Sequence, residues 1–137
     1  MEESSVAPLV LTTQRATGSF SIGADVVASA PAVLELSVTK VVNPDRSGVG
    51  LAIYVAPAAG NQDDAASRIL VGNPSLYPAD SPNRFTLRTS AAFLKLSGGG
   101  AAKPARLIVE LKRLNEKQPW NQVELTIAPP KWSAAPK

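Results

Sequence analysis

The stretch Ala-Arg-Leu-Ile-Val-Glu-Leu-Lys at residues 105–112 alternates apolar and polar side chains, and it decides the fold class of this chain. Leu107, Val109 and Leu111 fall on one face of an extended segment, while charged residues occupy most of the other face. A period of two is the spacing of a β-strand that buries one face and exposes the other. The pattern therefore predicts a half-buried strand at residues 105–114.

The same alternation recurs along most of the chain, between prolines and glycines that signal turns. It predicts further strands at residues 7–12, 18–28 (broken near Gly23), 32–42, 49–56, 68–71, 84–88, 91–96 and 121–127. For residues 91–96 one helical turn is the alternative, and no segment shows a sustained helical period. Short strands at regular spacing predict an all-β fold: a single antiparallel β-sandwich, or a partly open barrel, of about seven to nine strands with little or no helix.

One connection is specified closely by its residues. Asn-Pro-Asp-Arg-Ser-Gly at 43–48 separates two predicted strands. Asn and Asp side chains hydrogen-bond to nearby backbone groups, proline fixes φ, and glycine accepts a positive φ. We therefore expect a turn here, with the glycine as the residue that takes the left-handed conformation.

The chain is long enough for one domain with a conventional core, since 137 residues bury sufficient surface without disulfides. We expect a β-sandwich over residues 7–127, a polar N-terminal tail at 1–6 and a proline-rich C-terminal tail at 128–137. Three prolines in the last ten residues predict that this tail forms neither strand nor helix. Trp132, inside the tail, would then have no core to join.

Histidine and cysteine are both absent, and this excludes many kinds of chemistry. Without them the chain cannot form a Ser-His-Asp or Cys-His nucleophile, a His or Cys zinc site, an iron–sulfur site or a disulfide. Carboxylate, lysine or tyrosine chemistry remains possible. We expect no enzymatic activity, no cofactor and no metal.

Charge and hydropathy exclude two further classes of partner. The net charge is +3, from 14 basic and 11 acidic residues that are scattered along the chain, whereas nucleic-acid binding proteins cluster their basic residues. No apolar run approaches the ~20 residues of a transmembrane helix. The acidic start, Met-Glu-Glu-Ser-Ser, is not followed by the apolar region of a signal peptide. We therefore expect a cytoplasmic protein, or an exported one in trimmed form.

Carboxylates are the remaining candidates for chemistry. Asp63 and Asp64 sit together in a polar loop and could attract Ca²⁺, but they match no calcium-binding loop, and a solvated loop explains them better. Glycoside hydrolysis needs two carboxylates across a cleft. Glu35, Glu110 and Glu124 all fall on predicted outward strand faces, where an exposed sheet surface also requires them.

The large aromatic residues are the best candidates for contact with a partner. Tyr54, Tyr77, Trp120 and Trp132 are the four predicted contact residues. Tyrosine and tryptophan anchor many protein interfaces, and exposed aromatic rings also stack on sugars. Lys112, Arg113 and Lys117 form a small basic cluster near Trp120 that could hold an anionic partner or only cap a solvated strand end.

From Leu34 onward the order of elements resembles the C-terminal β-sandwich of tyrosinases and plant polyphenol oxidases. The matching stretches are Ala52-Ile53-Tyr54-Val55, Val71-Gly72-Asn73-Pro74-Ser75-Leu76-Tyr77-Pro78, Phe85-Thr86-Leu87, Ala105-Arg106-Leu107-Ile108-Val109-Glu110 and Val123-Glu124-Leu125-Thr126-Ile127. The resemblance covers roughly two thirds of the chain and implies a domain that shields or docks on an enzyme rather than reacting. The histidines of the dicopper centre are missing, so oxidase activity is not implied.

These observations favour a non-enzymatic structural or accessory subunit of a larger protein assembly, acting through sheet-face and tail contacts. The alternative is a β-sandwich module that binds carbohydrate or another small ligand, with Tyr54, Tyr77 or a tryptophan as the stacking platform. A carboxylate-based hydrolase is the third hypothesis. The position of the aromatic residues separates the first two, since a sugar site needs them on an open concave surface.

Overall fold

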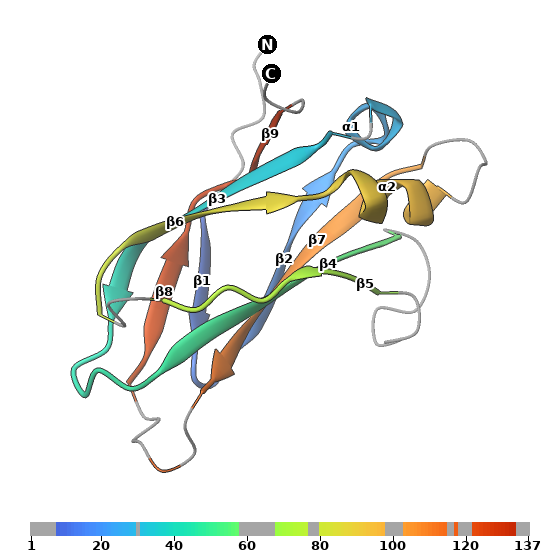
Figure 1. Ribbon diagram of the computed structural model, residues 1–137. Helices are drawn as coiled ribbons and strands as arrows, with labels where there is room; N and C mark the ends of the chain where they lie inside the picture. The colour runs from blue at the N-terminus through green and yellow to red at the C-terminus, as the bar shows by residue number, and fades with distance from the viewer. Residues whose placement is uncertain are drawn as a thin grey trace.

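The computed structural model describes residues 8–29, 31–57, 68–76, 80–97, 103–114, 117 and 122–133. They form two antiparallel β-sheets stacked face to face, with two short helices near one end of the stack (Figure 1). The predicted all-β sandwich is therefore confirmed. The nine strands of the described residues lie within the expected range.

The first sheet is built around one long strand. Its strands are β1 (Leu9–Thr12), β8 (Glu124–Ile127), β3 (Val33–Val42) and β6 (Asn83–Arg88), in that order, with β9 (Lys131–Ser133) as an additional partner of β3. The C-terminal half of β3 pairs with β8, and its first residues pair with β9. The register shifts between Val38 and Lys40, so an irregularity of the β-bulge type lies within the β3–β8 pairing.

The second sheet carries the longest ladder in the molecule. Its strands are β2 (Thr17–Ile22), β7 (Ala105–Arg113), β4 (Val49–Pro57) and β5 (Ile69–Gly72), in that order. β4 and β7 pair over their whole length, from Val49 opposite Arg113 to Pro57 opposite Ala105. An isolated bridge between Gly50 and Ser75 adds a second partner beside the start of β4.

The core lies between the two sheets. The apolar side chains of the alternating sequence fill it. Aliphatic side chains at every second position of the long strands are almost fully buried: Leu34, Leu36 and Val38 on β3, Leu51, Ile53 and Val55 on β4, and Leu107, Val109 and Leu111 on β7. Burial of each large aliphatic side chain contributes about 1.5–3 kcal/mol to stability. The predicted inward faces of these strands are confirmed.

Two predicted strand segments are helical. The segment predicted as a strand over 18–28 ends its strand at Ile22, and helix α1 (Ala24–Ser29) follows. The Gly23 carbonyl accepts hydrogen bonds from the amides of Val26 and Val27, both at 3.1 Å, and so starts the first helical turn. The prediction of a strand at 91–96 is also wrong, because helix α2 (Ser90–Ser97) occupies this segment.

The C-terminal tail is part of the sandwich, which corrects two expectations. Residues 131–133 form strand β9, so the prediction that the segment 128–137 contains no strand is wrong, and the sandwich extends beyond residue 127 to Ser133. Residues 128–130, which include Pro129 and Pro130, separate β8 from β9. The chain then pairs with β3 again through β9. Trp132 is opposite Leu34 in this register and packs against the core, so it does have a core to join.

The turn at 43–48 is confirmed, with one difference. The buried Asn43 side chain donates a hydrogen bond to the Ser47 carbonyl (2.8 Å) and accepts one from the Ser47 amide (3.1 Å). Arg46, with a φ of 52°, takes the left-handed conformation, whereas the sequence predicts it for Gly48. A turn held at both ends by one asparagine imposes this conformation on a non-glycine residue.

Candidate contact surface over the β4–β7 ladder

The outer face of β4 is unusual because its side chains are small. The inward positions hold Leu51, Ile53 and Val55, which leaves Gly50, Ala52, Tyr54 and Ala56 on the outer face. At Gly50 even a Cβ atom would lie 3.0 Å from Leu114 Cδ2 and 3.3 Å from the Pro74 carbonyl oxygen. Gly50, Ala52 and Ala56 therefore form a surface without large side chains, here called the floor. The ring of Tyr54 stands beside it.

A hollow of about 470 Å³, here called the β4 hollow, lies over this floor. Its lining residues come from β4, the end of β7 and the segment that follows β5: Gly50, Leu51, Ala52, Tyr54, Leu70, Asn73, Ser75, Lys112, Arg113 and Leu114. The bridge between Gly50 and Ser75 and the hydrogen bond from the Leu51 amide to the Pro74 carbonyl (2.8 Å) fix one wall against the floor. The β7 ladder fixes the other wall.

Tyr54 lies on this concave surface, at the end of the hollow opposite Leu114. Its half-buried ring carries the Arg68 guanidinium, whose central carbon is 5.4 Å from the ring centroid. The Nε atom of Arg68 is buried and has no hydrogen-bond partner. The contact is a cation–π interaction that fixes the guanidinium and covers one face of the ring.

The charged side chains at the hollow come from the end of β7. Lys112 and Arg113 line it, and Arg68 lies beside it on Tyr54. Lys112 Nζ forms an ion pair with Glu110 Oε1 at 3.1 Å, so one carboxylate offsets one of these cations. Among the described residues that line the hollow, Lys112 and Arg113 are the charged ones.

Exposed leucines stand at the edge of the same surface. Leu70 is 54% exposed and Leu114 is 53% exposed, and both line the hollow. Leu70 is opposite Tyr54 in the β4–β5 register, so it lies on the outer face of the sheet. Apolar side chains beside cations in a concavity give this surface the mixed character of a protein interface.

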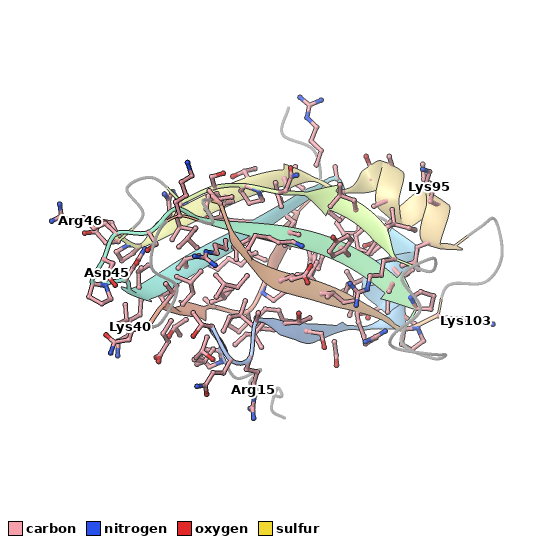
Figure 2. The ribbon with its side chains drawn as sticks, turned by 90° about the horizontal axis from the view of Figure 1, so that it is seen from below. Arg15, Lys40, Asp45, Arg46, Lys95 and Lys103 are labelled. Atoms are coloured by element: carbon pink, nitrogen blue, oxygen red, sulfur yellow. The ribbon has the colours of Figure 1, made fainter. Side chains whose placement is uncertain are left out.

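Charged residues elsewhere are spread around the sandwich, as the sequence predicted. Figure 2 shows labelled side chains on different sides of the molecule, projecting away from the sheets: Arg15, Lys40, Asp45, Arg46, Lys95 and Lys103. Arg46 pairs with Asp80 at 3.0 Å, an interaction at the surface that contributes little to stability. None of these labelled residues lines the β4 hollow.

The three glutamates considered for hydrolysis do not converge. Glu35 and Glu124 belong to β3 and β8 of the first sheet, whereas Glu110 belongs to β7 of the second sheet. Glu35 pairs with Arg84 at 3.0 Å and Glu110 with Lys112, each on the outer side of its own sheet. The sandwich core separates Glu110 from the other two carboxylates, so the three cannot share a cleft.

Of the remaining candidate residues, only Trp132 lies within the described part of the chain. Trp132 contacts the core, and Tyr77, Trp120, Asp63 and Asp64 lie outside the described residues. Among the residues that the structure describes, no three His, Cys, Asp or Glu side chains gather where they could hold a metal ion. In the same part of the chain, no helix has the length and hydropathy needed to cross a membrane.

Sequence reasoning identified Tyr54 but missed the hollow beside it. The signal was present in the alternation itself, since the positions facing away from the core in 50–56 hold Gly50, Ala52 and Ala56 rather than the charged residues typical of an exposed face. Leu70, Asn73 and Ser75 gave no such signal, because only the pairing of β5 and the following segment with β4 brings them to this place.

Comparison with solved structures supports the fold. A recombinantly expressed latent aurone synthase (polyphenol oxidase) superposes with a TM-score of 0.53 at 12% identity, covering 97% of this chain and 28% of that chain. Latent aurone synthase (polyphenol oxidase) from a natural source gives a TM-score of 0.50 at 12% identity, with 97% and 29% coverage. This chain thus spans less than a third of the length of either enzyme. No protein-family model matches the sequence, and no curated protein matches it.

Proposed function

We propose that this chain is a non-catalytic β-sandwich module that docks on a partner protein through the outer face of its second sheet. The observation that carries the proposal is the β4 hollow, where Tyr54, two half-exposed leucines and two cations line one concavity. Tyrosine, arginine and apolar groups around a concave centre are typical of residues that dominate binding energy in interfaces.

Two further observations support a role by contact. The chain has neither histidine nor cysteine, and its candidate carboxylates are divided between opposite faces of the sandwich. The polyphenol oxidases with a similar fold are more than three times longer than this chain, so a sandwich of this kind occurs as one part of a larger protein. We therefore propose an accessory role in a larger assembly, with the chemistry supplied by the partner.

The test compares two double variants that remove the same kind of apolar surface. Leu70→Ser/Leu114→Ser changes the rim of the hollow, and Val10→Ser/Leu94→Ser changes exposed residues elsewhere. Native-source complexes are isolated with each tagged chain and quantified by mass spectrometry. We expect the first variant to lose a stoichiometric partner and the second to keep it, while both melt close to the unmodified protein. Equal retention of the partner by both variants would refute the proposed surface.

A carbohydrate-binding module is the second candidate, because Tyr54 lies on an open concave surface with Asn73 and Ser75 as hydrogen-bonding groups. The Arg68 guanidinium covers one face of the tyrosine ring, so a sugar could stack only on the other face. Titration of the protein with neutral and acidic oligosaccharides, followed by tyrosine fluorescence, tests this candidate. Saturable binding that is lost in Tyr54→Ala and kept in Trp132→Phe would support it.

A further inference from the structure

We infer that strand β9 exchanges between two copies of this chain, so that the β9 of each copy pairs with the β3 of the other in a strand-swapped dimer. The acceptor is the groove between the first residues of β3 and the ring of Phe93 on helix α2. This inference goes beyond the proposed function. It concerns the first sheet and a second copy of the chain, whereas the proposed docking surface lies on the second sheet.

Strand β9 is attached to its own sandwich by few contacts. It has three residues, and among the described strands it pairs with β3 alone. Lys131 and Ser133 are exposed, so Trp132 is its one side chain that packs against the core. Figure 1 shows β9 beside the first part of β3, beyond the end of β8. A short strand held by one buried side chain opens at a smaller cost than the central strands do.

The connector between β8 and β9 favours exchange. Its three residues, 128–130, pass only two residues of β3, so the connector is one residue longer than the strand beside it. The Ala128 amide donates to the Ser37 carbonyl (2.9 Å), but Pro129 and Pro130 have no N–H to donate. Consecutive prolines keep a chain extended, at about 3.1 Å per residue. A released β9 therefore projects away from its own groove, and the stiff connector loses little entropy when β9 is fixed in another copy.

The groove accepts an identical strand best. Trp132 lies opposite Leu34 and meets the ring of Phe93, which is only 1% exposed. Without β9, this ring would face water and the start of β3 would present an unpaired strand edge. The β9 of a second copy restores the same register and the same aromatic pair. The exchanged dimer keeps the native contacts, so its formation costs mainly the entropy of association.

The absence of cysteine allows a direct test by disulfide trapping. Val33→Cys and Ser133→Cys are placed on separate chains, because these two residues are partners in the β3–β9 register. The chains are mixed in urea, refolded together at about 0.5 mM, near the effective concentration of a tethered segment, and then oxidised. Native pairing brings the two cysteines together only when β9 of one copy lies beside β3 of the other. We expect the 33–133 disulfide to be a major product, identified by mass spectrometry.

The matched control uses two strands that do not exchange. Thr12→Cys and Glu124→Cys are also placed on separate chains, at partner positions of the β1–β8 register. A tight turn joins β1 to β2, with backbone hydrogen bonds in both directions between Thr12 and Arg15. We expect the 33–133 disulfide to exceed the 12–124 disulfide about tenfold, because random collisions treat both pairs alike. Equal yields would overturn the inference.

A second measurement uses chains without cysteine. Sedimentation of the unmodified chain from about 5 µM to about 500 µM should show a dimer whose fraction rises with concentration. Pro129→Gly/Pro130→Gly should reduce this fraction several-fold, because a flexible connector lets β9 return to its own groove. Trp132→Ala should abolish the dimer.

Two results of the sedimentation experiment would overturn the inference. One is a chain that stays monomeric at every concentration, and the other is a dimer that persists unchanged in both variants. Failure here is distinguishable from failure of the docking proposal. The loss of a native partner in Leu70→Ser/Leu114→Ser tests residues of the β4 hollow on the second sheet, and none of the exchange variants changes that surface.

Discussion

The indole of Trp132 meets the ring of Phe93 edge-on, with the ring centroids 5.3 Å apart and the planes inclined at 73°. Phe93 is almost fully buried on helix α2, and Trp132 reaches it from β9, the last strand of the described residues. This geometry is favourable for aromatic pairs. The contact therefore joins the C-terminal segment to the helix that covers one end of the sandwich.

Removal of this ring should destabilise the domain. We expect Trp132→Ala to lower the free energy of unfolding by about 2–3 kcal/mol, through loss of buried apolar area and of the aromatic pair. The melting temperature should fall by on the order of 10 °C. Ser133→Ala, at an exposed position of the same strand, is the control and should leave the melting temperature unchanged. An unchanged value for Trp132→Ala would restore the tail as a candidate partner anchor.

The turn between β3 and β4 depends on one side chain. Asn43→Ala removes the two side-chain hydrogen bonds to the Ser47 backbone, both at a buried position. We expect a loss of about 2 kcal/mol in a urea titration. Asp45→Ala, an exposed change in the same turn, should lose less than about 0.5 kcal/mol. Similar losses for both variants would contradict the assigned role of Asn43.

The left-handed residue of this turn offers a change in the opposite direction. Arg46 has a φ of 52°, a conformation in which glycine carries no steric penalty. Arg46→Gly should raise the stability by up to about 1 kcal/mol, and Arg46→Val should lower it. The ion pair with Asp80 is exposed, so its loss changes the free energy of unfolding little. If Arg46→Gly and Arg46→Val have the same stability, backbone strain at this position is negligible.

Thr89 connects helix α2 to the start of β3. It is fully buried, its hydroxyl donates to the Pro31 carbonyl (2.7 Å), and its amide donates to the Ala32 carbonyl (2.9 Å). Thr89→Val keeps the shape but removes the hydroxyl bond, and we expect a cost of about 1–2 kcal/mol by calorimetry. Thr86→Val, on an exposed position of β6, should cost nothing measurable. Equal melting of both variants would rule out a stabilising role for the buried hydroxyl.

The protein should bind no transition metal specifically. Its strong potential ligands are carboxylates, which suit Ca²⁺ or Mg²⁺ better than zinc, copper or iron. Elemental analysis of dialysed protein should show these three metals far below one equivalent, and a chelator should leave the melting curve unchanged. A stoichiometric amount of any of them would contradict this expectation.

The sequence predicts best where one strand face is fully apolar. The alternation in 34–38, 49–55 and 105–111 specifies strands and their inward faces, because a shift of one residue would expose every apolar side chain. Helix α2 could not be predicted from the same kind of pattern. Eight residues are too short for a helical period to emerge, although Ala92 and Phe93 are buried and Leu96 is partly so. Strand β9 could not be predicted either, because it forms by pairing with β3, which is far away in the chain.

The contact surface could likewise be predicted only in part. Tyr54 could be assigned to an outward face from its neighbours alone, but its environment could not. Arg68 reaches the ring only because β5 pairs with β4, and Lys112 reaches the hollow only because β7 does so on the other side. Short-range patterns determine which side of a strand a residue occupies, whereas the identity of its neighbours is set by pairings between distant segments.

The pairing of the first two strands with late ones has a consequence for synthesis of the protein. β1 pairs with β8 and β2 pairs with β7, so both early strands leave the ribosome long before their partners exist. At ~5–20 residues per second this delay lasts several seconds. During that time Phe20 and Ile22, buried in the finished sandwich, are without their core. In a nascent chain of this topology the first two strands therefore stay without their sheet partners, and chaperone occupancy should be highest before residues 105–127 emerge.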